Sequence, residues 1–193
     1  MNLVAVETTT GTTSVALFDD GVLVAAISRE AKGDACLPMI DELLSSRSLS
    51  ARDIARWAVD VGPGSFTGVR VGLSTVKGIA FATGAEVVGV SAFDALAYGH
   101  RDVPPSADPS TDDSIVILEA GKGEVYFRVA REMGHAPLAT VKTMIAARTE
   151  PVIGPGIRPT AEGVGRAALG RPASDLDSLE PMYVRAPDLT KPR

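Results

Sequence analysis

Short apolar runs alternate with turn residues over the first thirty positions of the chain. Residues 3–6, 13–18 and 22–27 are rich in apolar and β-branched side chains, and the turn-forming sequences Thr10-Gly11 and Asp19-Asp20-Gly21 separate them. Because both separators are short, the pattern predicts three strands joined as consecutive hairpins.

The next segment changes to apolar spacings of three and four, which predict helices. Leu37, Ile40 and Leu44 fall on one face of a helix expected over residues 37–46, with Pro38 in its first turn. Ser50 and Asp53 have the spacing of a capping pair for a short helix.

A strand, a glycine-rich loop and a long helix are predicted to follow one another directly. Residues 57–61 have the composition of a strand, and residues 66–83 that of a helix with Gly84 as its C-cap. A further strand is expected over residues 87–90, and Ser91 is expected to cap a third helix that ends near Gly99.

The composition changes to prolines and aspartates between residues 100 and 113, which is typical of a linker. We therefore expect an N-terminal lobe over residues 1–99 and a smaller C-terminal lobe over residues 114–193. In the second lobe, residues 115–118 and 124–130 predict a hairpin, and residues 151–153 predict a short strand. The sequence shows no clear internal repeat, and the question of a weak echo between the two opening hairpin regions stays open.

Composition and charge exclude several classes of protein. Apolar residues make up 45% of the 193 positions and charged residues 22%, so neither a disordered chain nor a membrane protein is favoured. The net charge of -5 argues against strong RNA binding by this chain alone. Cys36 is the one cysteine, so an intrachain disulfide is excluded and a reducing compartment is expected. No run of roughly 18 apolar residues occurs, so a membrane-spanning helix is not expected, and we predict a cytoplasmic protein.

The loop Gly62-Pro63-Gly64-Ser65-Phe66-Thr67-Gly68 joins a strand to a helix, where free backbone N–H groups can face an anion. Gly62, Gly64, Ser65 and Thr67 are therefore candidate contacts for a nucleotide or another anion. Lys77 comes too late to complete a nucleotide-binding P-loop. The alternative is a sharp turn that simply requires glycine, and the sequence leaves both open.

The long helix contains Gly68, Gly72 and Gly78, each of which costs about 1 kcal/mol relative to alanine. Gly68 and Gly72 are four residues apart and share a face, so another backbone could approach closely there. An apolar stripe lies beside that face; it consists of Val69, Leu73, Val76 and Ala80. The approaching backbone could belong to the chain's own first helix, which the residues alone slightly favour, or to another protein.

The run GPGSFTGVRVGLSTVKGIAFATG closely resembles the signature of the TsaB family, also called YeaZ. Weaker agreement covers the Thr8-Thr9-Thr10 turn, Leu37-Pro38, the sequence EAGKGEVY at residues 119–126 and the sequence EPMYVR at residues 180–185. The resemblance implies an α/β fold of two related lobes, like those of actin, hexokinase and Hsp70 (ribonuclease H-like), with the second lobe shortened.

The resemblance also implies a function. It predicts a non-catalytic scaffold that binds and activates TsaD, which forms threonylcarbamoyladenosine beside the anticodon of tRNAs that read codons beginning with A. It implies TsaE as a further partner, a homodimer when the chain is alone, indirect contact with tRNA, no tightly bound cofactor, and ATP or ADP at the interface of the complex. The implied interface residues are Leu37, Ile40, Leu44, Gly68, Val69, Gly72, Leu73 and Val76. On this basis a bulky residue at Gly72 is expected to abolish TsaD binding and leave the subunit folded.

Two positions depart from the family pattern and leave alternatives open. Glu7 stands where members usually have aspartate, and Asp34 or Ala35 stands where many have histidine. The rival function is an ATP-dependent kinase or hydrolase that uses Glu7 and the glycine loop. A metallopeptidase is disfavoured, because the two histidines, His100 and His135, are not paired on a helix.

Overall fold

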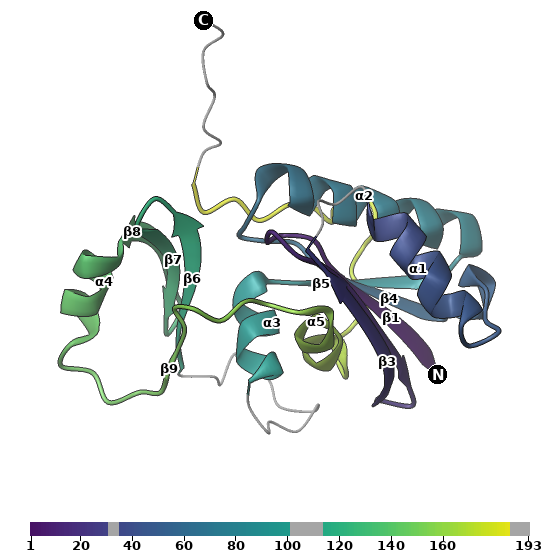
Figure 1. Cartoon of the computed structure of the whole chain (residues 1–193), viewed down its shortest axis with the longest axis horizontal. Coiled ribbons are helices and arrows are strands. Elements are labelled where there is room, and N and C mark those ends of the chain that lie inside the picture. Colours follow the sequence, from purple (N-terminus) through teal and green to yellow (C-terminus); the bar gives the residue numbers. More distant parts are fainter. Residues whose placement is uncertain (31–34, 101–113, 186–193) are drawn as a thin grey trace, which may run out of the picture.

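The described part of the chain forms two β-sheets, and its helices pack mainly around the larger one (Figure 1). The computed structural model describes residues 1–30, 35–100 and 114–185. The expected linker falls almost wholly on residues 101–113, outside the described residues, and so does Asp34.

The first sheet has the strand order β3-β2-β1-β4-β5. Its strands are β1 (Asn2–Glu7), β2 (Thr13–Asp19), β3 (Val22–Arg29), β4 (Arg56–Asp60) and β5 (Glu86–Val90). Strand β2 runs antiparallel to both of its neighbours, whereas β1, β4 and β5 are mutually parallel. The three predicted strands of the opening hairpins and both later strands are confirmed.

Helices cover both faces of this sheet (Figure 1). Helices α1 (Cys36–Ser45) and α2 (Phe66–Thr83) pack on one face, against residues such as Val4 and Val6. Helices α3 (Ala92–Gly99) and α5 (Ala161–Ala168) pack on the other face, against Leu3 and Ala5. The alternation of side chains along β1 therefore divides the core into two layers.

The helix boundaries follow the capping signals in the sequence. Ser65 caps α2 by accepting a hydrogen bond from Gly68 N at 3.2 Å, and Gly84 ends the helix in the left-handed conformation. Ser91 caps α3 in the same way. The predicted short helix is the 3₁₀ turn η2 (Ala51–Asp53), where Ser50 and Asp53 form a capping box.

The second sheet repeats the connectivity of the first. Its order is β8-β7-β6-β9, with strands β6 (Ile115–Gly121), β7 (Glu124–Val129), β8 (Glu132–Pro137) and β9 (Val152–Ile153). Helix α4 (Leu138–Ile145) precedes β9, as α1 precedes β4. Each sheet thus contains an antiparallel meander, a helix and a parallel strand, so the two lobes are related. Among the described residues, the second sheet has no counterpart of β5.

The C-terminal part of the chain returns to the first lobe, contrary to the expected division at residue 114. Helix α5 packs on α3 and on the first sheet, because its glycines allow close approach: a Cβ at Gly163 would collide with Ala95 O of α3, and one at Gly165 would collide with the Phe18 ring of β2. Beyond it, Ser174 N donates to Val87 O at 2.7 Å and Met182 N donates to Val61 O at 2.7 Å. The second lobe therefore ends near β9. Strand β8 and helices α4 and α5 are elements that the sequence analysis missed.

Candidate functional site

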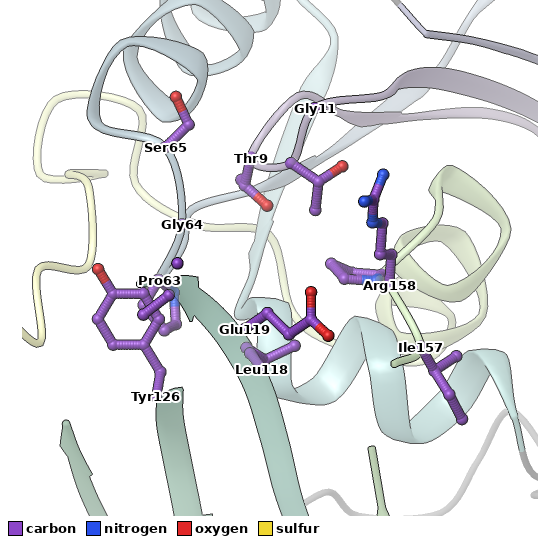
Figure 2. Close-up of a pocket in the computed structure, with 14 residues that line it drawn as sticks. Thr9, Gly11, Pro63, Gly64, Ser65, Leu118, Glu119, Tyr126, Ile157 and Arg158 are labelled. Carbon is purple, nitrogen blue, oxygen red and sulfur yellow. The ribbon is translucent and has the colours of Figure 1, made fainter. Parts of the chain in front are cut away.

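A cleft of about 270 Å³ lies between the two lobes. Figure 2 shows the side chains that surround it, which come from the β1–β2 loop, the loop before α2, the β6–β7 hairpin and the segment before α5. The polar lining residues are Thr9, Thr10, Ser65, Glu119, Tyr126 and Arg158. Of the predicted anion contacts, Gly64 and Ser65 line this cleft, whereas Gly62 and Thr67 do not.

Beneath the cleft, Glu7 is fully buried at the end of β1. Its Oε1 accepts hydrogen bonds from Thr9 N at 2.5 Å, Thr9 Oγ1 at 2.8 Å and Thr10 N at 3.1 Å. Its Oε2 accepts one from Thr10 Oγ1 at 3.3 Å. The carboxylate is therefore occupied in holding the β1–β2 turn, as a strand-end carboxylate would be, and it is not turned towards the cleft as a metal ligand.

A second fully buried carboxyl group, that of Asp60, lies beside Glu7. Thr9 Oγ1 is 2.8 Å from Glu7 Oε1 and 3.1 Å from Asp60 Oδ2. A hydroxyl has one hydrogen, so both contacts are satisfied only when one carboxyl is protonated and donates to Thr9. Burial raises the pKa of Glu7 to about 7. Burial, and then the charge of Glu7, raise the pKa of Asp60 well above its ordinary value.

The glycine loop itself is shaped by close packing within the chain. Gly62 has φ +102°, and a Cβ there would lie 2.8 Å from Met182 O. A Cβ at Gly64 would lie 2.5 Å from Thr9 O. Two of the loop's N–H groups already have acceptors, since Gly62 N donates to Asp60 Oδ1 at 2.7 Å and Ser65 N donates to Thr9 O at 2.6 Å. This geometry favours the sharp-turn interpretation of the loop over an anion cradle.

The glycines of α2 also serve contacts within the chain. A Cβ at Gly68 would collide with the carbonyl oxygen of Thr8, and a Cβ at Gly72 would collide with the Thr8 hydroxyl. Close approach of another backbone was therefore predicted correctly. The idea that these two glycines exist to admit a foreign helix is wrong, because the β1–β2 loop occupies their face. Of the three glycines, only Gly78 faces open space, since a Cβ there would meet nothing within 4 Å.

The segment 180–185 crosses the start of α2 and reaches the second lobe. Tyr183 lies 5.3 Å from Phe66, measured between ring centroids, and Arg70 Nε donates to the Tyr183 hydroxyl at 2.9 Å. Arg185 Nη1 donates to Glu124 Oε2 on β7 at 2.9 Å. Three segments that carried the family resemblance thus meet in space. These contacts could not be predicted from the sequence, because the contacting residues are 61 to 117 positions apart along the chain.

Comparison with known proteins identifies the family. The family model described as TsaD, tRNA N6-adenosine threonylcarbamoyltransferase, matches residues 7–148. The tRNA threonylcarbamoyladenosine biosynthesis protein TsaB of Haemophilus influenzae is 33% identical over 135 residues, which are 68% of this chain and 55% of that protein. The chain belongs to the TsaB family.

Further TsaB proteins agree with this assignment. That of Escherichia coli is 36% identical over 129 residues, covering 66% of this chain and 54% of that protein. The chain therefore spans about half the length of the curated TsaB relatives that it matches. A tRNA N6-adenosine threonylcarbamoyltransferase of Sphingopyxis alaskensis is 27% identical over 161 residues, covering 83% of this chain and 44% of that protein.

The fold expected from the TsaB resemblance is confirmed. The solved structure of YeaZ from Pseudomonas aeruginosa superposes with a TM-score of 0.73 over 94% of this chain and 99% of that chain, at 22% sequence identity. At this identity the likeness concerns the fold alone. The two mixed sheets with flanking helices agree with the α/β, two-lobe class.

Most of the implied TsaD-contacting residues of this TsaB chain are buried in its own core. Five of them, Ile40, Leu44, Val69, Leu73 and Val76, are buried hydrophobic residues. They occupy the faces of α1 and α2 that pack on the sheet, so in this structure they are not available to a partner. Leu37 is different, with 57% of its surface exposed.

The outer face of α2 presents another set of residues, which the sequence analysis did not select. They are Val71, Ser74, Gly78, Phe81 and Ala82, at helical spacing along one stripe. Phe81 is 83% exposed, the highest value among the large apolar residues that the structure describes. The sequence does contain a pattern that indicates this outer stripe: the aromatic residue Phe81 follows the small residues Ser74 and Gly78 at helical spacings of three and four.

Other candidate chemistry is weak. Burial raises the pKa of the Cys36 thiol to about 11, which disfavours a reactive cysteine. Within residues 1–30, 35–100 and 114–185, no three His, Cys, Asp or Glu side chains gather as a metal site would require. None of the helices in these ranges is long and apolar enough to cross a membrane.

Proposed function

We propose that this chain is an accessory subunit in the synthesis of threonylcarbamoyladenosine on tRNA, and that it binds and activates TsaD through the outer faces of α1 and α2. The names of the TsaB relatives support the pathway. The main structural support for binding through α2 is the outer stripe of this helix, which is uncharged and includes the exposed ring of Phe81.

This stripe has the chemistry of a helix-docking surface. Ser74 and Gly78 carry little or no side chain, so a partner helix can lie close to the backbone of α2. Burial of the Phe81 ring would contribute roughly 2 kcal/mol to association. Leu37, on the neighbouring helix α1, adds a second exposed apolar side chain. Large aromatic side chains surrounded by small contacts are typical anchors of protein interfaces.

The absence of a catalytic role is part of the proposal. Glu7, the residue that a kinase or hydrolase of this fold would use near a metal, is fully buried and accepts four hydrogen bonds from Thr9 and Thr10. The N–H groups of Gly62 and Ser65 have acceptors within the chain. These contacts favour a binding subunit over an ATP-dependent enzyme.

The partners follow from the family. TsaD is the proposed heterodimer partner, and TsaE is proposed to join the complex. In the absence of TsaD, the same outer stripe is proposed to pair with a second copy of this chain, because an exposed apolar surface tends to be covered. ATP or ADP is proposed to bind at the interface of the complex and tRNA to be contacted indirectly.

The test is a substitution on the outer stripe. Gly78→Leu adds a side chain in open space and should leave the chain folded, but it should prevent close approach of a partner helix. Co-purification with TsaD from the same organism and the threonylcarbamoyladenosine content of tRNA should both fall. Ala139→Leu adds the same side chain to the exposed face of α4 and should change neither. Undiminished TsaD binding by a folded Gly78→Leu protein would refute the proposed interface.

The rival enzymatic function has its own test. Steady ATP hydrolysis by the purified chain, lost on Glu7→Gln, would favour a kinase or hydrolase. We expect no turnover above that of a Glu30→Gln control, whose side chain is exposed at the end of the first sheet.

A further inference from the structure

The two carboxyl groups beneath the inter-lobe cleft belong to one chain of hydrogen bonds. Thr9 Oγ1 lies 3.1 Å from Asp60 Oδ2 and 2.8 Å from Glu7 Oε1. Thr10 Oγ1 lies 3.3 Å from Glu7 Oε2 and 3.2 Å from the carbonyl oxygen of Thr12. Both Thr9 and Thr10 line the cleft, and Figure 2 shows Thr9 on its wall. The chain therefore connects a fully buried carboxyl group, that of Asp60, to the surface of the cleft.

The hydrogens in this chain can be counted. Each of the two threonine hydroxyls lies between two oxygens, and a hydroxyl carries one hydrogen. Because Thr12 O can only accept, Thr10 must donate to it, and Glu7 must then carry a proton on Oε2. Glu7 Oε1 has no proton in that case, so Thr9 donates to it and Asp60 carries a second proton on Oδ2. All four contacts are thus satisfied together only when both carboxyl groups are protonated.

Ionisation changes the direction of one hydrogen bond in this chain. When Glu7 is ionised, its Oε2 accepts from the Thr10 hydroxyl, and that hydroxyl can no longer donate to Thr12 O. The contact between Thr10 and Thr12 crosses the β1–β2 turn. The number of hydrogen bonds that hold the turn therefore depends on whether Glu7 carries a proton.

The charges around the pair do not compensate for ionisation. Among the described residues, neither Glu7 nor Asp60 forms an ion pair with a cationic side chain. Asp94 of α3 is the further charged group that acts on Asp60, and it is itself paired with Arg128 and Arg171. Burial raises the pKa of Glu7 to about 7, and burial together with the charge of Glu7 raises the pKa of Asp60 well above its ordinary value. Both protons are therefore held on the acid side of pH 7 and are released as the pH rises.

The pair is also attached to the loop that begins α2. Asp60 Oδ1 accepts a hydrogen bond of 2.7 Å from Gly62 N. Thr9 O accepts one of 2.6 Å from Ser65 N, at the N-cap of α2. Gly64, between these two positions, lines the cleft. A change in the hydrogen bonds of Thr9 or Asp60 is thus passed directly to a second wall of the cleft.

We propose that the β1–β2 turn is a proton-controlled switch in the wall of the inter-lobe cleft. With both protons bound, every contact in the chain is satisfied and the turn is held against the start of α2. When the protons leave, two buried negative charges lie next to each other, and water enters from the cleft to solvate them. The turn and the start of α2 then loosen together. The switch does not depend on the proposed binding of TsaD.

Infrared spectroscopy of the full chain tests for the protons, because the carbonyl stretch of a protonated carboxyl group is distinct from that of a carboxylate. Ordinary carboxyl groups are ionised above about pH 6. A protonated-carboxyl band should therefore remain at that pH and disappear as the pH rises through and beyond 7. Glu7→Gln and Asp60→Asn should each remove part of it, whereas Asp41→Asn, on the exposed side of α1, should not.

Hydrogen exchange, followed by NMR and corrected for the intrinsic effect of pH, tests whether the protons hold the turn. The protection of the Thr9 and Ser65 amides should fall about tenfold per pH unit above 7 for each proton released. In the double variant Glu7→Gln/Asp60→Asn, the side-chain amides donate where the carboxyl protons did. Its turn should therefore stay protected over the whole range.

The outcomes are distinct. A pH-dependent loss of protection that is confined to the turn and the start of α2, and is absent from the double variant, supports the switch. Absence of the protonated-carboxyl band from the wild type overturns it. A parallel loss of protection in β5 also overturns it, because the protons would then set only the stability of the whole fold.

Discussion

The hydroxyl of Thr8 donates a hydrogen bond of 2.7 Å to the carbonyl oxygen of Gly68 in the first turn of α2. Through this bond, the loop that forms one wall of the inter-lobe cleft is fixed to the helix that carries the outer stripe. Thr9, the next residue, lines the cleft and accepts a hydrogen bond from Ser65 N at the N-cap of the same helix. One wall of the cleft is therefore held directly against α2.

The contact between Thr8 and α2 predicts that Gly72 is a stability position. Gly72→Ala would place a methyl group against the Thr8 hydroxyl, so the loop or the helix must shift. We expect the free energy of unfolding to fall by about 2 to 3 kcal/mol, as for overpacked cores, in a urea titration. This is the reverse of the sequence-based expectation that a bulky residue at Gly72 leaves the subunit folded.

Gly78→Ala provides the comparison within the same helix. A Cβ at Gly78 meets nothing within 4 Å, so only the helix propensity changes, and stability should rise by about 0.5 to 1 kcal/mol. If the alanine variants at positions 72 and 78 had equal stability, the packing of the β1–β2 loop on α2 would not be as described.

The buried carboxyl pair predicts that stability depends on pH. The pKa of Glu7 is raised from 4.5 to about 7 in the folded chain, so the folded state holds this proton more tightly than the unfolded state. The contribution to stability is therefore complete below pH 4.5 and is lost as the pH rises through 7. The raised pKa of Asp60 acts in the same direction.

Glu7→Gln isolates this effect. The amide cannot ionise, so the variant should gain stability relative to the wild type as the pH rises from 4.5 to 7, by an amount on the order of 3 kcal/mol. Urea titrations at several pH values measure the difference. Asp41→Asn, on the exposed side of α1, serves as the control. A constant difference between Glu7→Gln and wild type across this range would contradict the raised pKa.

The first lobe was largely predictable because its elements carry local signals. The bounds of α2 follow from Ser65 as N-cap and Gly84 as C-cap, and both act within one turn of the helix. Helix α5 gave no such apolar signal, because the residues that it buries are mostly glycine and alanine. Its packing depends on close approach to α3, where a Cβ at Gly163 would collide with Ala95 O.

The candidate site was less predictable than the fold, because it depends on which face of a helix is covered. The spacing of Gly68 and Gly72 indicates a close approach but cannot identify the approaching residue. The structure identifies it as Thr8, sixty positions earlier in the chain. Likewise, nothing local to Arg171 indicates that its guanidinium pairs with Asp94 of α3, at 3.2 Å between Nη2 and Oδ2.

The position of Cys36 predicts a thiol that is inert in the folded chain. Burial raises its pKa to about 11, so at pH 8 only roughly one thiol in a thousand is ionised, and the side chain is inaccessible. Alkylation by iodoacetamide, followed by mass spectrometry, should be slow in buffer and fast in urea. Rapid modification of the native protein would show that the start of α1 opens readily.

The contact between Tyr183 and the start of α2 predicts how the C-terminal segment is held. Tyr183→Ala removes the ring that packs on Phe66 and the acceptor of the Arg70 hydrogen bond. Because Tyr183 is partly exposed, we expect a loss of only about 1 kcal/mol in global stability. Hydrogen exchange should rise clearly in peptides that cover residues 176–185. Tyr183→Phe keeps the ring and loses the hydrogen bond, so its exchange should lie nearer to the wild type. If the alanine and phenylalanine variants exchanged at the same rate, the stacked ring would not be what holds this segment in place.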